Sequence, residues 1–466
     1  MPDIPVRQGG TYEVDIHGMG HGGEGVGRFE GFTLFVPGAL IGERVQARVK
    51  RVQKQFGEAE LVQILQSVNE RIQPRCNVYE ECGGCQLQHM DYAAQLRQKR
   101  QTVIDALERI GGFKGIHVHD PIGMDEPWRY RNKIVLPVTA AVSVSSEAAK
   151  RLSTAGYYRR GTHEVVSIDD CAIAHEQLER AALTLLDVLN DLEIPPYNAT
   201  TGKGVARAVM ARNGFGTGEL MLVLITGTRD LPQKERLIAE VKRRLPDLTS
   251  FVHNINSRDA GDALGCETSL LYGRDHIYEQ LGTLRFSISA QSFFQVNPIQ
   301  TLQLYGKAVE YAELTGTETV VDAHCGTGAI ALFMAHQAQR VYGFEPIRPA
   351  IADAKENARL NHVANAVFTT GTAERGLGNL YADGVRPDVI VLDPPRKGCE
   401  PELLELLVKH RPKKIVYVSC NPATLARDLK RLAVGGYELG EIQPVDMFPQ
   451  TVHVECVCSL IYKGFE

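Results

Sequence analysis

A cysteine stands where a buried strand breaks in the C-terminal part of the chain. The segment IVYVSCNPATLARDL covers residues 415–429, and its first residues form the apolar run typical of a buried strand. Cys420 follows that run, and Asn421-Pro422 ends it. A thiol at the C-terminal edge of a strand can be buried filler, a redox group or a nucleophile. An acid, Glu455, stands beside the last strand-like segment, in DMFPQTVHVECVCSL.

One cysteine and one carboxylate are the side chains that carbon-5 chemistry on uracil needs. Carbon 5 of uracil is a poor nucleophile, and a thiolate that adds to carbon 6 converts the ring to an enolate. Once carbon 5 has taken a methyl group, a base must remove its proton so that the thiolate can leave. Cys420 and Glu455 are candidates for these two roles. Asp393 or Arg396 is a candidate for polarising the uracil carbonyl.

A candidate cofactor loop precedes these residues. The segment ETVVDAHCGTGAIALFMA has the pattern of a strand, an acid, a glycine turn and the start of a helix. Gly326 and Gly328 let backbone amides approach a ligand closely, although an ordinary strand-to-helix turn has the same pattern. A dinucleotide fingerprint requires a third glycine where Ala331 stands. Glu345 ends the next strand-like segment, where it can accept both hydroxyls of a ribose. This combination fits S-adenosylmethionine better than NAD.

A rigid turn ends the third strand-like segment of this region. Asp393-Pro394-Pro395 lies at the edge where α/β sheets bind ligands, and the prolines fix its backbone. Amino-group methyltransferases often carry Asn or Asp, then Pro-Pro, then an aromatic residue at this place. Arg396 stands where the aromatic residue would be, which argues against an exocyclic amine as the methyl acceptor.

Three cysteines with metal-ligand spacing lie near residue 80. Cys76, Cys82 and Cys85 form a C-x5-C-x2-C run, and Cys171 is the candidate fourth ligand. Four thiolates suit either zinc or a [4Fe–4S] cluster, and the spacing alone leaves both open, with His89 as a further zinc candidate. A radical S-adenosylmethionine enzyme, such as a methylthiolating one, would show C-x3-C-x2-C, which is absent from the sequence.

The elements that must position these residues alternate between strands and helices from about residue 290, as in an α/β domain. The apolar runs predict strands at 319–322, 340–344, 388–392 and 414–418. The helical spacing predicts helices at 329–335, 349–361 and 400–409.

The N-terminal half predicts contacts with nucleic acid. Residues 1–66 read as short strands between glycine-rich turns, which is typical of a small OB-like barrel. Its basic segment is either a solvated strand face or a phosphate-binding surface, and includes Arg44, Arg48, Lys50, Arg51 and Lys54. Further along, basic residues alternate with aromatic residues that could stack on bases, namely Trp128, Tyr130, Tyr157 and Tyr158.

The composition is that of a globular protein with several domains. The chain has 466 residues and a formal net charge of −5, so it is not coated in positive charge. No stretch of about 18 apolar residues exists, which predicts no membrane span. The N-terminus has no secretory signal, so we expect a cytoplasmic protein whose ten cysteines are not a disulfide scaffold.

Five motifs in order resemble the RNA uridine-5-methyltransferase family, and the whole chain resembles its bacterial 23S rRNA branch. They are SFFQVN (292–297), DAHCGTG (322–328), LDPPRKG (392–398), SCNPATLARDL (419–429) and FPQTVHVE (448–455). The first unit, with VPGALIGE (36–43), resembles a TRAM RNA-binding barrel. Two positions depart from the family pattern: His324 replaces an aromatic residue, and Ala329 replaces an Asn of some members.

The resemblance implies a fold and a reaction. It implies a Rossmann-like methyltransferase domain (95–127 and 290–466), an α+β central domain (67–94 and 128–289) and a TRAM barrel (1–66). The reaction would be S-adenosylmethionine-dependent methylation of a uridine, in 23S rRNA or alternatively in tRNA, by a monomer. A redox-sensing RNA-binding protein with an inert methyltransferase fold is the non-enzymatic alternative.

The resemblance also implies roles for individual residues. Cys420 would be the nucleophile and Glu455 the base, and the four cysteines would hold a [4Fe–4S] cluster rather than zinc. Contacts with cofactor or substrate would come from the strand-end residues and the glycine loop, namely Gln295, His324, Gly326, Gly328, Glu345 and Asp393.

Overall fold

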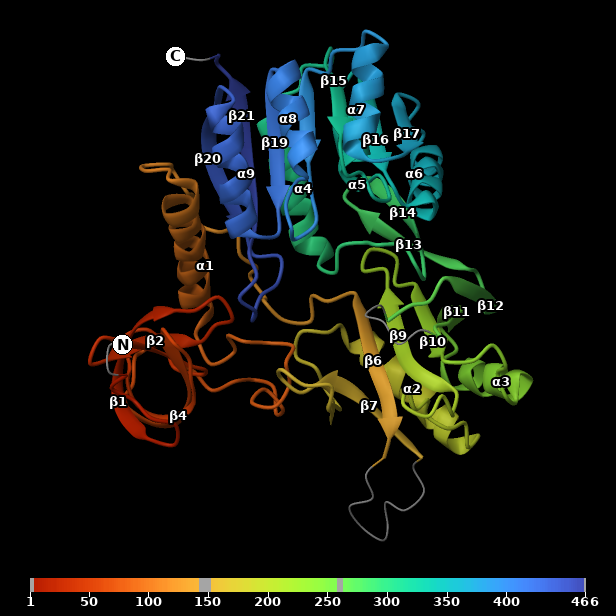
Figure 1. The fold of residues 1–466 in the computed structure, drawn as a ribbon. Coiled ribbons are helices and arrows are strands. Elements are labelled where there is room, and N and C mark those ends of the chain that lie inside the picture. The colour runs from red at the N-terminus through yellow and green to blue at the C-terminus, as the bar shows by residue number, and fades with distance from the viewer. Residues whose placement is uncertain (1–3, 142–151, 258–262, 465–466) are drawn as a thin grey trace.

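A closed barrel of five strands forms the N-terminal part of the computed structural model, which describes residues 4–141, 152–257 and 263–464 (Figure 1). Strands alternate between apolar residues that face the barrel core and polar residues that face outward, as in Arg44–Val52. The strands close in the order β1-β2-β3-β5-β4. They are β1 (Thr11–Met19), β2 (Gly25–Phe29), β3 (Phe32–Val36), β4 (Arg44–Val52) and β5 (Phe56–Gln66).

A seven-stranded sheet in the order β12-β11-β10-β9-β6-β7-β8 forms the central part. Only β10 and β11 run parallel among these described neighbours. The strands are β6 (Lys133–Ala140), β7 (Ser153–Tyr158), β8 (Val165–Ser167), β9 (Ala206–Asn213), β10 (Leu220–Thr226), β11 (Leu248–Ile255) and β12 (Glu267–Gly273). Helix α2 (Glu176–Asp191) packs on β9 and against α3 (Lys234–Arg244). A hairpin of β13 (His276–Leu281) and β14 (Leu284–Ser289) follows.

The C-terminal part is a second seven-stranded sheet, in the order β17-β16-β15-β18-β19-β21-β20. Its first five strands are parallel, and β21 lies antiparallel between β19 and β20. The strands are β15 (Thr319–Asp322), β16 (Arg340–Glu345), β17 (Ala366–Thr370), β18 (Val389–Leu392), β19 (Lys414–Ser419), β20 (Tyr437–Val445) and β21 (Glu455–Tyr462). The strands and helices predicted from the sequence in this part are therefore present, with ends that differ by at most one or two residues.

Six helices flank this sheet. They are α4 (Pro298–Ala312), α5 (Ala329–Ala335), α6 (Arg348–Leu360), α7 (Ala373–Ala382), α8 (Pro401–His410) and α9 (Pro422–Val434). Because β15, β16, β18 and β19 are parallel, their C-terminal ends meet at one edge of the sheet. That edge carries the predicted cofactor loop and the cysteine.

A segment from early in the sequence completes this part of the molecule (Figure 1). Helix α1 (Tyr92–Ala106), which continues into a π-helical turn η1 (Leu107–Gly111), packs against α9 and β20. The extended segment 115–122 then runs along β20, with parallel bridges from Val118 to Ile442 and from Ile122 to Val445. Helix α1 and the segment after it therefore contact the C-terminal part, while the domain assignment of 95–127 stays a prediction.

Candidate active site and cofactor loop

The sheet register brings Cys420 and Glu455 to neighbouring strand ends. Cys420 directly follows β19, and Glu455 is the first residue of β21. These two strands are antiparallel, with Ser419 opposite Cys456, so the next residues outward are Cys420 and Glu455. Asn421 caps helix α9 by accepting a hydrogen bond from the Ala423 backbone at 3.0 Å. Cys420 therefore lies at the positive end of a thirteen-residue helix, which favours its thiolate.

Three titratable groups interact at this strand edge, namely Cys420, Glu455 and Asp393. Burial raises the pKa of Cys420 to about 11, and Glu455 and Asp393 contribute, while Arg396 lowers it. Burial also raises the pKa of Glu455 to about 7, against the opposing effect of Arg396. The pKa of Asp393 lies well above its ordinary value, first because of burial and then because of Glu455 and Asp322. Glu455 can therefore both accept and release a proton near neutral pH.

Arg396 and His453 form the polar wall beside the thiol. The guanidinium Nη2 of Arg396 lies 3.3 Å from Nε2 of His453. Burial first, and then Arg396, lower the pKa of His453 to about 4, so the imidazole is neutral at neutral pH. The Arg396 carbonyl accepts hydrogen bonds from Asn421 at 3.1 Å and from Thr424 at 3.3 Å, which fixes this loop on the start of α9.

A cavity of about 130 Å³ connects the thiol to the barrel. Its walls come from the Cys420 turn, residues 452–454, helix α1 and the β1–β2 end of the barrel, where His21 lies. Lys99 on α1 lines it too, and its Nζ is 2.5 Å from a carboxylate oxygen of the buried Asp446. This pair ties α1 to the end of β20. No local motif marks Lys99 as a cavity residue, and His453 lies inside the FPQTVHVE motif without a predicted role.

The glycine loop leaves polar atoms free for a ligand. Asp322 at the end of β15 accepts a hydrogen bond from the His324 backbone at 3.3 Å through Oδ1. Its Oδ2 and the Nδ1 of His324 are buried and have no hydrogen-bond partner among the described residues. Gly326 has a φ of +49°, and a Cβ there would meet only open space. Gly328 has a φ of +85° at the start of α5.

Burial shifts the pKa values of two residues in this loop. It raises the pKa of Asp322 to about 7, with a smaller contribution from Glu345, and lowers the pKa of His324 to about 4. Glu345 lies half-buried at the end of β16, where it accepts a hydrogen bond from the Ile347 backbone at 2.9 Å. The unpaired polar atoms and the open space over Gly326 fit a polar ligand such as S-adenosylmethionine.

One tyrosine without a predicted role lies near the acidic groups of the strand ends. Tyr305 on α4 is buried, and burial, Asp393, Glu455 and Asp322 raise its pKa, whereas a hydrogen bond from Gln295 opposes the shift. Gln295 is itself buried before α4, and its carbonyl accepts a hydrogen bond from Asn132 at 3.1 Å. No local motif marks Tyr305, because an aromatic residue at helical spacing is usually core.

The four predicted ligand cysteines gather in the central part. Burial first, and then Cys171, Cys82 and Cys76, raise the pKa of Cys85 to about 12. Cys85 and Cys171 belong to one apolar cluster, and Cys76 packs against it. Among the described residues, no three of these sulfurs all lie within 4.8 Å of one another. His89 donates to or accepts from the Tyr79 hydroxyl at 2.6 Å.

The predicted aromatic stacking surface is largely wrong. Tyr130 is fully buried, and its hydroxyl donates to the Pro449 carbonyl at 3.0 Å, so it cannot stack on a base. Trp128 and Tyr157 pack against the apolar cluster of the central part, and Arg75 lies over the Trp128 ring. Tyr158 alone of the four is exposed. Three of these four aromatic residues therefore pack into the protein, from the loop before β6 and from β7.

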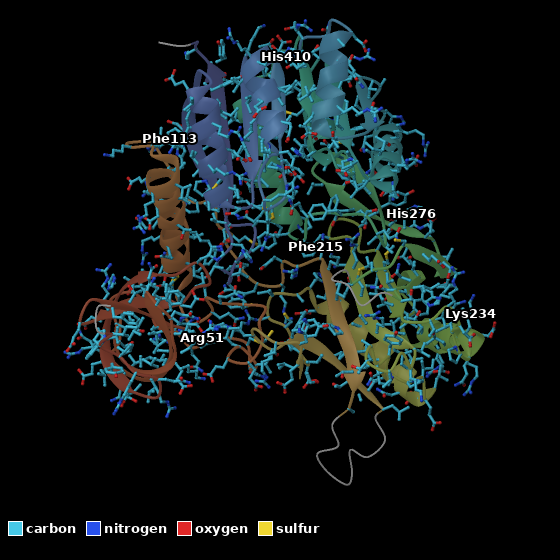
Figure 2. All side chains as sticks on the ribbon, in the orientation of Figure 1. Arg51, Phe113, Phe215, Lys234, His276 and His410 are labelled. Carbon is cyan, nitrogen blue, oxygen red and sulfur yellow. The ribbon has the colours of Figure 1, made fainter. Side chains whose placement is uncertain are left out.

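The basic strand of the barrel is neutralised by neighbouring acids. Arg44 pairs with Glu13 at 2.7 Å, Arg48 and Lys50 both pair with Glu60 at 2.6 Å, and Arg51, labelled in Figure 2, pairs with Glu58. Exposed ion pairs of this kind contribute little stability. They do reduce the net positive charge of β4. The ion pairs therefore favour the interpretation of this strand as a solvated face rather than as a continuous phosphate-binding surface.

Comparisons with known proteins agree with this geometry. Residues 265–463 match the family described as tRNA (uracil-5-)-methyltransferase, and residues 5–62 match the TRAM domain. A protein of Halalkalibacterium halodurans named uncharacterized RNA methyltransferase is 46% identical over 460 residues, which are 99% of each chain. A protein of Clostridium tetani with the same name is 44% identical and covers 99% of this chain and 98% of its own.

A solved structure is similar over the whole chain. It is the tRNA (uracil-54, C5)-methyltransferase of Pyrococcus abyssi in complex with S-adenosyl-L-homocysteine, which is 27% identical with a TM-score of 0.74. The match covers 97% of this chain and 100% of the other. Together with the barrel and the Rossmann-like sheet, these findings confirm the predicted fold class and the predicted enzyme class. The chain belongs to the S-adenosylmethionine-dependent RNA uracil-5-methyltransferase family and carries a TRAM domain.

Proposed function

We propose that this enzyme methylates carbon 5 of a uridine in 23S rRNA through a covalent bond between Cys420 Sγ and carbon 6. The observation that carries the mechanism is the placement of Cys420 and Glu455 at adjacent ends of β19 and β21. The thiol opens on a cavity, and the carboxyl is buried beside it. Family membership favours this reading over an inert RNA-binding protein.

The residues divide the reaction between them. The Cys420 thiol gives its proton to water, the resulting thiolate forms the bond to carbon 6, and the electron pair of the carbon 5–carbon 6 double bond moves to carbon 5 and the carbonyl. S-adenosylmethionine, when bound, supplies the methyl group that carbon 5 takes. Glu455 then accepts the carbon-5 proton, the carbon 5–carbon 6 double bond re-forms, and the bond to sulfur breaks. Arg396 is placed to stabilise the negative charge that develops on the ring, because it lines the same cavity.

The cofactor site that we propose lies along the parallel strand ends. Glu345 would bind the ribose hydroxyls, and the Gly326–Gly328 loop would approach the cofactor with its backbone. His324, Gln295 and Asp393 would complete the contacts. The buried, unpaired atoms of Asp322 and His324 support this assignment.

The assignment to 23S rRNA rests on the resemblance of the whole chain to the rRNA branch of the family. The similarity to the Pyrococcus abyssi tRNA (uracil-54, C5)-methyltransferase favours tRNA as the alternative. The barrel end at His21 borders the thiol cavity, so the barrel would hold RNA close to the reacting base. We further propose a cytoplasmic monomer, since one chain supplies every residue of the site. No helix of the described residues is long and apolar enough to cross a membrane.

The RNA class is tested by methylating purified 23S rRNA and tRNA separately with the enzyme and S-adenosylmethionine. Digestion and mass spectrometry then quantify 5-methyluridine. We expect 5-methyluridine at defined positions in 23S rRNA transcripts. Methylation of tRNA alone would transfer the proposal to tRNA, and unmodified uridine in both would contradict it.

We also propose that the four cysteines hold a [4Fe–4S] cluster with a structural or RNA-positioning role. All four are free thiols, and three are buried, which suits a resident metal centre. Zinc–sulfur bonds of about 2.3 Å would hold the sulfurs roughly 3.8 Å apart. The resemblance of the whole chain to the family favours the iron–sulfur cluster over zinc. Methyl transfer needs no electron from such a cluster.

Replacing Cys171 by Ser should bleach the protein. Anaerobically purified wild-type enzyme should be brown, with broad absorption near about 400 nm. Loss of one thiolate should remove most of the iron, because the cluster is held by four cysteine ligands. The matched control is Cys266→Ser, which changes an exposed cysteine and should keep the colour. Stoichiometric zinc without iron in the anaerobic wild-type protein would contradict the assignment.

A further inference from the structure

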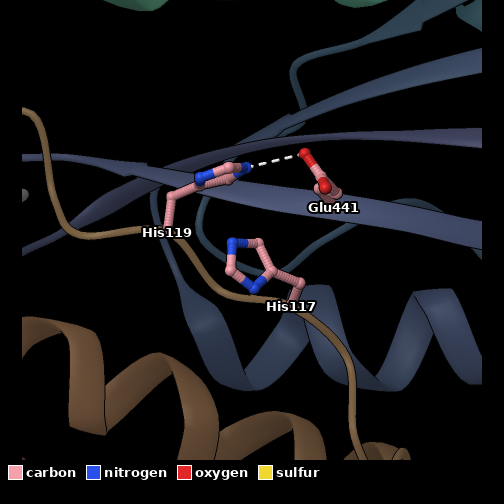
Figure 3. A group of neighbouring side chains, drawn as sticks. All are labelled: His117, His119 and Glu441. Atoms are coloured by element: carbon pink, nitrogen blue, oxygen red, sulfur yellow. Dashed lines mark hydrogen bonds and ion pairs between the residues drawn. The ribbon is translucent and has the colours of Figure 1, made fainter.

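Two histidines and a glutamate converge beside β20, the edge strand of the C-terminal methyltransferase sheet (Figure 3). His117 and His119 come from the segment that runs along β20, and Glu441 lies on β20 itself. Their ligand atoms all lie within 4.8 Å of one another. Among the described residues, no other group of three such side chains meets this spacing.

The backbone fixes these three side chains on one face. The His119 amide donates to the Ile442 carbonyl, and the Ile442 amide donates to the His117 carbonyl, both at 3.0 Å. Val118 between the histidines is buried. Because side chains alternate along an extended segment, the two imidazoles share the opposite, solvent-facing side. Glu441, next to Ile442, joins them there.

The contacts between the side chains are close and polar. Nε2 of His119 lies 2.8 Å from Oε2 of Glu441. The two imidazole rings are edge-to-face, with centroids 4.4 Å apart. Lys307 is a nearby cation that acts electrostatically on the Glu441 carboxylate. Lys307 on α4 is itself paired with Glu310 at 2.8 Å.

We propose that His117, His119 and Glu441 bind a divalent transition-metal ion at the surface of the sheet. Two neutral imidazoles and one carboxylate suit Zn²⁺, Ni²⁺ or Cu²⁺ and disfavour Mg²⁺ and Ca²⁺, which prefer oxygen ligands. Three protein ligands leave the remaining coordination positions to water. The ion would replace the hydrogen bond between His119 and Glu441 with bonds from both residues to the metal.

Such an ion would join two segments that are 322 residues apart in the sequence. Segment 115–122 is held on β20 by backbone bridges at two residues. A metal clip across a long chain separation stabilises the closed arrangement. The site would therefore hold the chain that leads from α1 into the central part firmly against the methyltransferase sheet.

The test is zinc binding by untagged, chelator-treated enzyme, prepared anaerobically so that the cysteine site is in the same state in every sample. Calorimetry should detect one additional zinc site in the wild type compared with His119→Ala. Loss of the His119 ligand should weaken zinc binding at that site by at least about tenfold. Replacing a residue that only hydrogen-bonds to a metal ligand typically costs about tenfold or more in metal affinity. His336→Ala, which removes an exposed histidine of a distant helix end, should bind zinc like the wild type.

Two further measurements make the result decisive. Glu441→Gln keeps the side-chain shape and should weaken zinc binding without changing the unfolding temperature of the metal-free protein. Zinc should raise the unfolding temperature of the wild type and of His336→Ala more than that of His119→Ala. Equal zinc stoichiometry and affinity in wild type, His119→Ala and Glu441→Gln would overturn the proposal.

Discussion

Glu455→Gln enzyme should accumulate as a covalent complex with methylated RNA that survives denaturing electrophoresis. The amide cannot accept the carbon-5 proton, whereas attack by Cys420 and methyl transfer do not require that base. Turnover should fall by about a hundredfold or more, the scale for losing a general base. The measurement is gel electrophoresis of enzyme with radiolabelled RNA and S-adenosylmethionine, combined with mass spectrometry of the linked peptide.

Cys420→Ala should fail differently, because it removes the first bond. Neither 5-methyluridine nor a denaturant-resistant complex should form, and the double variant with Glu455→Gln should behave in the same way. RNA that carries 5-fluorouridine should trap the wild type, since fluorine cannot leave as a cation. Cys399→Ala is the matched control: this thiol is buried against the Tyr417 hydroxyl and should be dispensable for trapping. A complex formed by Cys420→Ala would assign the nucleophile to another cysteine.

Local sequence predicted the parallel strands of the catalytic sheet well. Strands at 319–322 and 414–418 are short, continuous apolar runs bounded by turns, and the structure has them at Thr319–Asp322 and Lys414–Ser419. Their ends carry Asp322 and Cys420 because ligands of α/β sheets bind at that edge. Each of these predictions depends only on residues that are close together in the chain.

Contacts between distant segments could not be predicted in this way. The ion pairs of Arg48 and Lys50 with Glu60 depend on the register of β4 against β5, which the basic run alone does not reveal. The burial of Tyr130 depends on how the loop before β6 meets the loop at Pro449. Lys99 and His117 reach the C-terminal part only because α1 and the segment after it pack on that sheet.

Glu455→Gln should also make the folded protein more stable at pH 8 than the wild type, by about 3 kcal/mol. Burial raises the pKa of this carboxyl from 4.5 to about 7 in the folded protein. A raised carboxyl pKa means that folding is favoured while the group is protonated and is penalised once it ionises. The penalty grows as the pH rises from about 4.5 and is complete above about 7.

Glutamine carries no such penalty at any pH. Asp322 and Asp393 have raised pKa values too, but they are present in both proteins and largely cancel in the comparison. The stability difference between Glu455→Gln and wild type should therefore shrink to under about 1 kcal/mol at pH 5. Urea unfolding of both proteins at pH 5, 6.5 and 8 measures it.

A difference that does not grow with pH would mean that the ionised carboxylate is stabilised in the folded protein, and Glu455 could then not be a base with a pKa near neutrality. The expected gain in stability, together with the loss of turnover, has one cause: the enzyme keeps a carboxylate in a buried place because elimination requires a base there.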